Sequence, residues 1–444
     1  MKILFVIPPP LSIELPQLGL ASIAGVAFEQ GHNVFIVDLN LMCYESGLFE
    51  TNLWNEKFAL WCEERFCEES FEGIHKILLN QIKCLMGNGL NSFDIVAFHV
   101  NYASKNITRM LAERLRNTQD IEWIVAGGPG YFFKEYFGDT LPFDIVFCGE
   151  AETSWSNWLR QPFSKSTIGT TVVDLDLLPS PLFSKFQLFR YSFSNALPME
   201  TSRGCVNQCF FCNESLMWPG YRMKSFQRLG RDLKEIQDFG MGHVSFIDSL
   251  LNPSKKRLSE LTSLLKTSAL TWDGRMQCKF IDDATAKPIQ ESGCLHLFLG
   301  VESFSPEVLE HFGKIEASSK ARQAITSLGK VGVEVCVSLI ISGPPFQTEK
   351  DLNKDIEALI DLAPYIHSLT VSSLCILPRT ELWANAKKLG IKGLDTHDGW
   401  MNWYLDDKET DIAVRAQWLR RMIRNAQEVG IKVTDHPLPG TTNL

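Results

Sequence analysis

Several features that would assign a protein class at once are missing from this sequence. No uninterrupted apolar run reaches the ~18 residues that a membrane helix needs, so no transmembrane segment is predicted. Low-complexity tracts are absent, because the 30 glycines and 20 prolines are scattered along the chain. Basic residues are in the minority, with 43 lysines and arginines against 52 aspartates and glutamates. The formal charge of −9 therefore argues against a nucleic-acid partner.

An export signal is not apparent either. The opening segment MKILFVIPPP holds one lysine and a short apolar run that ends at three prolines, which favours a buried first strand over a signal peptide. The chain nevertheless contains 12 cysteines, and this number without an export signal is typical of a reducing compartment. We expect a cytoplasmic protein of at least two domains, since 444 residues exceed what one hydrophobic core usually organises.

Residues 1–160 alternate apolar and amphipathic segments. Strands are predicted at 2–7, 33–40, 94–100, 122–128 and 144–150, with helices at 18–31 and 106–117. This alternation predicts an α/β fold with a parallel sheet covered on both faces, a doubly wound, Rossmann-like domain. An insertion at 41–90 is rich in Phe, Trp, Glu and Cys, and we expect it to be helical.

The ends of these predicted strands carry proline, glycine and small polar residues. In a doubly wound sheet the ligand lies beyond the carboxyl ends of the strands, where the strand order reverses. The alternative, that these residues only turn the chain, stays open. His99 is expected to be a core histidine rather than a ligand. The residues expected to form a ligand-binding rim are Pro9, Pro10, Asn101, Ser104, Gly127, Gly128, Pro129, Gly130, Gly149, Glu150 and Glu152.

A second series of alternating strands and helices follows a proline-containing linker at 161–195. Six strands are predicted between 196 and 385, the third of them at 275–280, which fits a partial (β/α)6 TIM-like barrel better than a full eight-unit barrel. The remaining residues, 386–444, are predicted to form a short helical tail that packs on the barrel.

Three cysteines, Cys205, Cys209 and Cys212, follow the first strand of this barrel. Barrel enzymes keep their active sites at the carboxyl ends of the strands. The spacing lets one loop bind three irons of an iron-sulfur cube, so that the fourth iron stays open to a small molecule. A zinc site with a distant fourth ligand and a chance cluster of core cysteines are the alternatives.

The motif C-x3-C-x2-C, with the aromatic Phe211 just before its last cysteine, resembles the signature of the radical S-adenosylmethionine (radical SAM) superfamily. The resemblance implies a 4Fe-4S cluster, with Cys205, Cys209 and Cys212 as ligands, whose open iron binds S-adenosylmethionine. It also implies a 5′-deoxyadenosyl radical as the oxidant, and an electron donor such as flavodoxin or ferredoxin.

Later strands of the barrel are similar to the same superfamily. SFIDSLLN (245–252) keeps the first residue of an acidic pair, Asp248, and LFLGVES (297–303) resembles the strand whose Glu302 faces the cofactor. The resemblance implies that Asp248, Glu302 and Ser303 contact S-adenosylmethionine, through charge-assisted hydrogen bonds in the case of the carboxylates. Arg275 is expected either to pair with the cofactor carboxylate or to cap a helix. The loops IISGPPFQT and CILPRTEL depart from the family pattern, which leaves the substrate rim undefined.

A doubly wound domain ahead of such a barrel resembles the cobalamin-binding members of the superfamily, over residues 1 to about 385. The resemblance implies cobalamin at the rim, where strand-end glycines let the backbone approach a large ring. No histidine ligand to cobalt is expected, because the motif Asp-x-His-x-x-Gly is missing. The implied reaction is methyl transfer to an unactivated carbon of a small-molecule or peptide substrate.

Three other functions remain as alternatives. The first is a radical cyclase or oxidoreductase, with or without cobalamin. The second is methylthiolation of a transfer RNA or protein, which is disfavoured because the first 60 residues hold only Cys43 and the tail is short and not basic. The third is a non-catalytic corrinoid or iron-sulfur binding protein.

Overall fold

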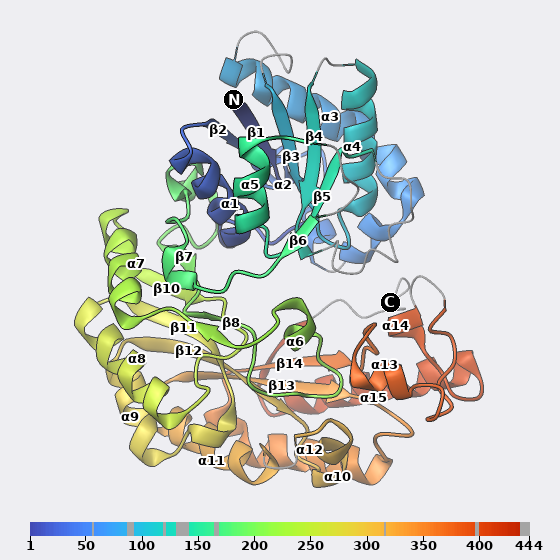
Figure 1. Cartoon of the computed structure of the whole chain (residues 1–444). Helices are drawn as coiled ribbons and strands as arrows, with labels where there is room; N and C mark the ends of the chain where they lie inside the picture. Colours follow the sequence, from blue (N-terminus) through green and yellow to red (C-terminus); the bar gives the residue numbers. More distant parts are fainter. Residues whose placement is uncertain are drawn as a thin grey trace. The chain divides into compact units, whose positions relative to one another are not determined.

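The computed structural model describes residues 1–55, 57–86, 93–118, 121–129, 142–163, 168–314, 317–395 and 399–435. Gly130, predicted to belong to the rim, lies outside these ranges. The chain divides into two compact units, Met1–Pro198 and Met199–Leu444, which are coloured blue to green and green to red in Figure 1. Within the described ranges, no helix combines the length and the apolar character needed to cross a bilayer.

The first unit is built on a six-stranded sheet of order β2-β1-β3-β4-β5-β6, in which every neighbouring pair runs parallel. This order confirms the predicted doubly wound arrangement, because the strand order reverses between β1 and β3. The strands are β1 (Lys2–Val6), β2 (Asn33–Val37), β3 (Ile95–His99), β4 (Trp123–Gly127), β5 (Ile145–Gly149) and β6 (Ile168–Thr170).

Helices of this unit pack in two groups. One group is α1 (Leu18–Glu29) with α5 (Glu152–Arg160), and the other is α2 (Leu39–Glu45), α3 (Glu64–Met86) and α4 (Lys105–Thr118). The predicted helical insertion at 41–90 supplies α3 and two short 3-10 turns. Its apolar side chains share a core with the central strands, which is why a long insertion is tolerated here. These side chains include Trp61, Cys67, Phe71, Ile74 and Leu78.

The predicted linker at 161–195 is instead largely part of the first unit. Strand β6 joins the edge of the sheet beside β5, and its three residues are too few to show a periodicity in the sequence. Further on, Leu182 N donates to Ala21 O at 2.9 Å, and the Tyr191 hydroxyl donates to Asp38 Oδ2 at 2.6 Å. Gly25 of α1 is required by this docking, since a Cβ there would lie 2.4 Å from Ser180 O.

The second unit contains a seven-stranded sheet of order β15-β14-β13-β12-β11-β10-β7, and the boundary between the units falls within β7. The pairs from β10 to β15 are parallel, as a barrel of βα units requires. The strands are β7 (Ala196–Met199), β10 (His243–Phe246), β11 (Thr271–Met276), β12 (Cys294–Glu302), β13 (Glu334–Ile341), β14 (Ser368–Ser373) and β15 (Lys432–Asp435).

Two predictions for this unit are wrong in detail. The third strand, β11, begins at Thr271 rather than 275, because half-exposed polar residues such as Asp273 alternate with its buried ones and conceal the apolar pattern. Residues 278–280 form a 3-10 turn. The described part of the tail contains helices at Gly399–Asn402 and Lys408–Glu428 as expected, but it also contributes β15, which pairs with β14 and adds a seventh strand.

Successive helices on this sheet contact one another in chain order, in the sequence α7, α8, α9, α11, α12 and α15, and Figure 1 shows them along one side of the strands. Two of these helices begin at side-chain caps. Ser254 accepts from Arg257 N at the start of α8, and Thr348 forms a capping box with Asp351 at the start of α12. The helices are α7 (Phe226–Asp238), α8 (Lys255–Ser268), α9 (Asp283–Glu291), α10 (Pro306–His311), α11 (Ala317–Lys330), α12 (Glu349–Leu362), α13 (Glu381–Asn385), α14 (Gly399–Asn402) and α15 (Lys408–Glu428).

The close approach at Gly25 makes a prediction. We expect Gly25→Ala to lower the free energy of unfolding by about 1–3 kcal/mol, because the new methyl group collides with a backbone carbonyl. Gly230 of α7 is the matched control, since a Cβ there would meet no atom within 4 Å. Gly230→Ala should stabilise the protein by about 0.5–1 kcal/mol. Urea unfolding followed by circular dichroism measures both, and equal effects of the two variants would contradict the docking of this segment.

Candidate functional site

The three cysteines lie on one loop at the carboxyl end of β7. The loop runs between the short strand β8 (Ser202–Arg203) and helix α6 (Glu214–Met217), and β8 pairs with β9 (Arg222–Met223) in an antiparallel ribbon. All three thiols are free and partly exposed. Cys212 N donates to Cys209 O at 3.0 Å, and Asn207 N donates to Cys205 Sγ at 3.4 Å. The loop therefore has its own hydrogen-bonded structure.

Neighbouring segments hold this cysteine loop from two directions. Phe210 N donates to Phe312 O at 3.1 Å, and Phe210 O accepts from Leu382 N at 3.0 Å. The ring of Phe211 meets that of Phe312 edge to face, with the centroids 5.0 Å apart. The sequence predicted Phe211 as a cofactor contact, and that role stays a prediction. In the structure the Phe211 ring packs against Phe312.

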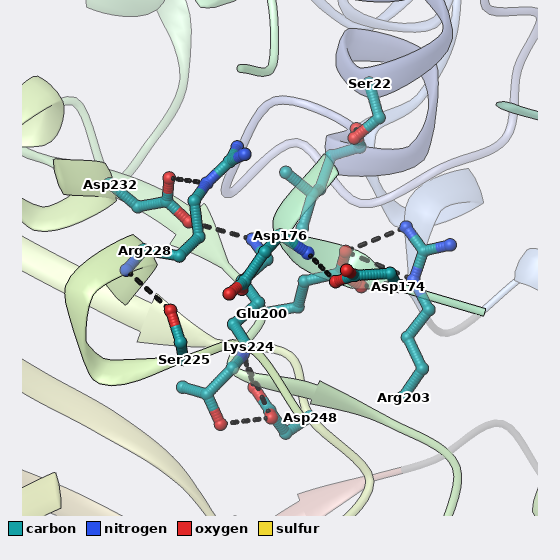
Figure 2. A network of polar contacts seen from close by, with 12 residues as sticks. Ser22, Asp174, Asp176, Glu200, Arg203, Lys224, Ser225, Arg228, Asp232 and Asp248 are labelled. Carbon is teal, nitrogen blue, oxygen red and sulfur yellow. Dashed lines mark hydrogen bonds and ion pairs between the residues drawn. The ribbon is translucent and has the colours of Figure 1, made fainter. Parts of the chain in front are cut away.

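Asp248 follows β10 and is almost fully buried. Its carboxylate accepts from Thr201 N at 2.9 and 3.0 Å, from Thr201 Oγ1 at 2.7 Å and from Ser202 Oγ at 2.6 Å. Figure 2 shows this carboxylate within a wider polar network that includes the ion pair of Arg203 and Glu200. Burial raises the pKa of Asp248 to about 6, although these hydrogen bonds oppose the rise. Asp248 thus binds the start of the cysteine loop, and direct contact with a cofactor stays a prediction.

Glu302, at the end of β12, forms a buried ion pair with Lys314. Its Oε1 lies 2.9 Å from Lys314 Nζ, and the side chains are 11% and 13% exposed. The backbone of Glu302 has a φ of 66°, which is rare for a residue other than glycine and is often found at functional sites. Burial alone would lower the pKa of Lys314, but the carboxylate of Glu302 and the thiol of Cys209 raise it. Lys314 was missed in the sequence analysis, because it follows α10 without any motif.

The other two cofactor contacts predicted on the barrel have protein partners. The Ser303 hydroxyl is buried and donates to Asp355 of α12 at 2.8 Å. Gln347, which departs from the family pattern, donates to the same carboxylate at 3.0 Å. Burial raises the pKa of Asp355 to about 7 despite these bonds. Arg275 is exposed, and its guanidinium lies 5.6 Å from the centroid of the Phe298 ring. Among the described residues it makes no hydrogen bond that would cap a helix.

The cysteine loop carries three thiol sulfurs, which are the donor atoms that bind iron-sulfur clusters. The pKa of Cys209 is raised to about 11 and that of Cys212 to about 12, mainly by burial and to a smaller extent by the neighbouring thiolates. In the part of the chain that the structure describes, no three His, Cys, Asp or Glu side chains are grouped to hold one metal ion. A cube of four irons needs no such group, because each thiolate binds a different iron.

The predicted rim of the first unit comes from neighbouring strands. Loops after β1, β3, β4 and β5 share one edge, because these strands are adjacent and parallel. Asn101 Nδ2 donates to Pro10 O at 2.6 Å, which joins two loops across the point where the strand order reverses. Ser104 N donates to Asn101 Oδ1 at 2.8 Å. Asn40, which the sequence placed in a strand, belongs to α2 and binds both N and O of Leu11. These hydrogen bonds fix the loops of the predicted ligand-binding rim.

The glycines and carboxylates of this rim have reasons of their own. Gly128 has a φ of 124°, and a Cβ there would lie 2.6 Å from Val100 O, so the neighbouring strand alone requires this glycine. Gly149 also has a positive φ and is exposed. Glu150 accepts from Val172 N at 2.6 Å and is buried, as is Glu152 in the first turn of α5. Replacement of Gly128 would therefore disturb the packing beside β3 itself, and the expectation that this glycine serves a ring stays a prediction.

Known proteins resemble this chain in both of its units. The model of the radical SAM superfamily matches residues 199–359. An uncharacterised methyltransferase of Pyrococcus horikoshii is 25% identical over 423 aligned residues, covering 87% of this chain and 83% of that protein. The structure of TsrM from Kitasatospora setae, a radical S-adenosylmethionine methyltransferase with cobalamin and a 4Fe-4S cluster bound, covers 100% of this chain and 92% of its own, with 13% identity and a TM-score of 0.67.

A second solved structure agrees. The cobalamin-dependent S-adenosylmethionine radical enzyme OxsB, with aqua-cobalamin bound, covers 86% of this chain and 55% of its own, with 17% identity and a TM-score of 0.57. At these identities the solved structures establish the fold. The predicted order of a doubly wound sheet followed by a barrel-like sheet of βα units is confirmed.

The contacts of Asp248 make a prediction about the cysteine loop. Asp248→Asn places an amide NH2 against donors, so we expect the free energy of unfolding to fall by about 2 kcal/mol and the bound iron to fall severalfold after anaerobic reconstitution. Asp273→Asn is the control, since Asp273 pairs with His243 elsewhere on β10 and β11. That variant should lose stability and keep its iron. Full iron content in Asp248→Asn would contradict the anchoring role.

Proposed function

We propose that this chain, whose second unit carries a radical SAM domain, is a cobalamin-dependent radical SAM enzyme that methylates an unactivated carbon. The observation that carries the proposal is the cysteine loop, three free thiols on one segment at the carboxyl end of a parallel barrel sheet. The fold shared with TsrM and OxsB supports cobalamin in the first unit, and the methyltransferase among the curated relatives supports methyl transfer.

The chain's own residues would hold the groups as follows. Cys205, Cys209 and Cys212 would bind the cluster, and Glu302 would face S-adenosylmethionine. The rim residues would bind cobalamin, with Asn101 joining two of their loops. When bound, the cluster and S-adenosylmethionine supply a radical that removes a substrate hydrogen, and cobalamin supplies the methyl group.

The apolar packing behind the loop shields one side of this site from water. Phe210 and Phe211 pack against a core that includes Phe312, Leu382 and Trp403. The exclusion of water there strengthens the electrostatic interactions of charged groups near the loop. The substrate is proposed to be a small molecule or a peptide, and the electron to come from a small donor protein such as flavodoxin or ferredoxin.

The cluster assignment predicts the behaviour of cysteine variants. Because all three ligands come from one loop, Cys205→Ala, Cys209→Ala and Cys212→Ala should each abolish reductive cleavage of S-adenosylmethionine and the charge-transfer absorption of the reconstituted cluster. The control is Cys62→Ala, which alters a thiol of the first unit and should keep both. Full cleavage by Cys209→Ala would refute the assignment, as would zinc in place of iron in the purified protein.

The cobalamin assignment makes a separate prediction. Wild-type protein produced with ample cobalamin should purify with a corrinoid absorption spectrum. Asn101→Ala removes the bond between two rim loops, so we expect about tenfold weaker cobalamin binding, with the cleavage of S-adenosylmethionine unchanged. The matched control is Asn106→Ala on α4. It removes a similar hydrogen bond, which Asn106 Nδ2 donates to Cys62 O at 2.9 Å. An iron-sulfur spectrum without corrinoid in the wild-type protein would exclude cobalamin-dependent methylation and leave a radical cyclase or oxidoreductase.

A further inference from the structure

Lys314 and Glu302 are two buried charges that no sequence motif of this chain connects. Lys314 Nζ lies 2.9 Å from Glu302 Oε1 and 3.1 Å from Gly300 O. The backbone of β12 lies close to the pair, because a Cβ at Gly300 would lie 2.9 Å from Glu302 Oε1 and 3.5 Å from Lys314 Nζ. Each charge of such a largely buried pair would be costly to bury without the other.

The backbone that carries Lys314 is attached to the cysteine loop. Lys314 N donates to Leu309 O at 2.8 Å, which closes the end of α10, and Phe312 O accepts from Phe210 N at 3.1 Å. Gly313 has a φ of 70°, and a Cβ there would lie 2.9 Å from the Phe210 ring. The segment 312–314 therefore packs directly on Phe210, the residue after Cys209, which places the backbone of Lys314 beside the cysteine loop.

The ion pair is only slightly exposed to solvent, with side chains that are 11% and 13% exposed. Charges in such a site are only weakly screened by salt, so they would act on a group bound at the neighbouring loop.

We propose that Lys314 and Glu302 form a charge pair that sets the reduction potential of the cluster on the cysteine loop. Reduction adds an electron to the cluster, so a nearby cation stabilises the reduced form and a nearby anion destabilises it. Lys314 raises the potential and Glu302 lowers it. Lys314 is thus a positioning residue for Glu302 and an electrostatic partner of the cluster. The inference rests on the proposed function, because it requires a cluster on this loop.

The test is a redox titration of the full-length protein, reconstituted with iron and sulfide and followed by electron paramagnetic resonance without S-adenosylmethionine. Lys314→Met should shift the midpoint potential to more negative values, and Glu302→Gln should shift it to more positive values. The double variant should fall between the single ones. Opposite shifts distinguish charge from structure, because a loosened loop would move both potentials in the same direction.

Two further variants complete the design. Lys314→Arg keeps the charge and should stay near the wild-type potential. Lys354→Met removes another lysine ion pair, 2.7 Å from Glu307 at the start of α10, and should leave the potential unchanged. If Lys314→Met does not take up a cluster, Glu302→Gln alone decides, since its potential must rise.

The outcomes separate the two proposals. A wild-type protein that forms no 4Fe-4S cluster would overturn the proposed function. A cluster that forms normally, with potentials in Lys314→Met and Glu302→Gln that are unshifted or shifted in the same direction, would overturn only the role of the charge pair.

Discussion

Parallel strands bring all their carboxyl ends to one edge of a sheet, and the candidate sites of both units depend on this constraint. In the first unit it places the loops after β1, β3, β4 and β5 side by side. In the second unit it places the cysteine loop, Asp248 and Glu302 at the same ends of β7, β10 and β12. Residues distant in sequence therefore meet without any specific contact having to draw them together.

Within that frame, hydrogen bonds decide how well each loop is fixed. Asp248 accepts four hydrogen bonds from Thr201 and Ser202, and the loop beyond them is held at Phe210 by Phe312 and Leu382. Thiolates that bind a cluster repel one another, so a loop that holds three of them must be fixed by other contacts. The rim of the first unit uses neutral amides for the same purpose, as at Asn101.

The sequence predicted what is local and missed what the fold assembles. Strands such as KILFV and IVAFH are buried on both faces, so their apolar runs are readable, whereas β6 and β15 are short and include polar residues. The cysteine spacing predicted its site because all three ligands lie on one loop. Lys314 could not be predicted, because only the turn after α10 brings it to its partner Glu302. The sequence also could not show that Gly128 packs against Val100, a contact that requires glycine whether or not a ligand lies beside it.

The hydrogen bond from Leu382 to Phe210 has a consequence for how the protein is made. Synthesis proceeds from the N-terminus, so the three thiols emerge well before the residue that completes their support. The same holds for β15, which finishes the barrel sheet beside β14 only when the chain reaches Lys432–Asp435. The loop therefore reaches its finished form only after the chain has been synthesised beyond Leu382, and a cluster of the kind proposed above would be inserted after that point.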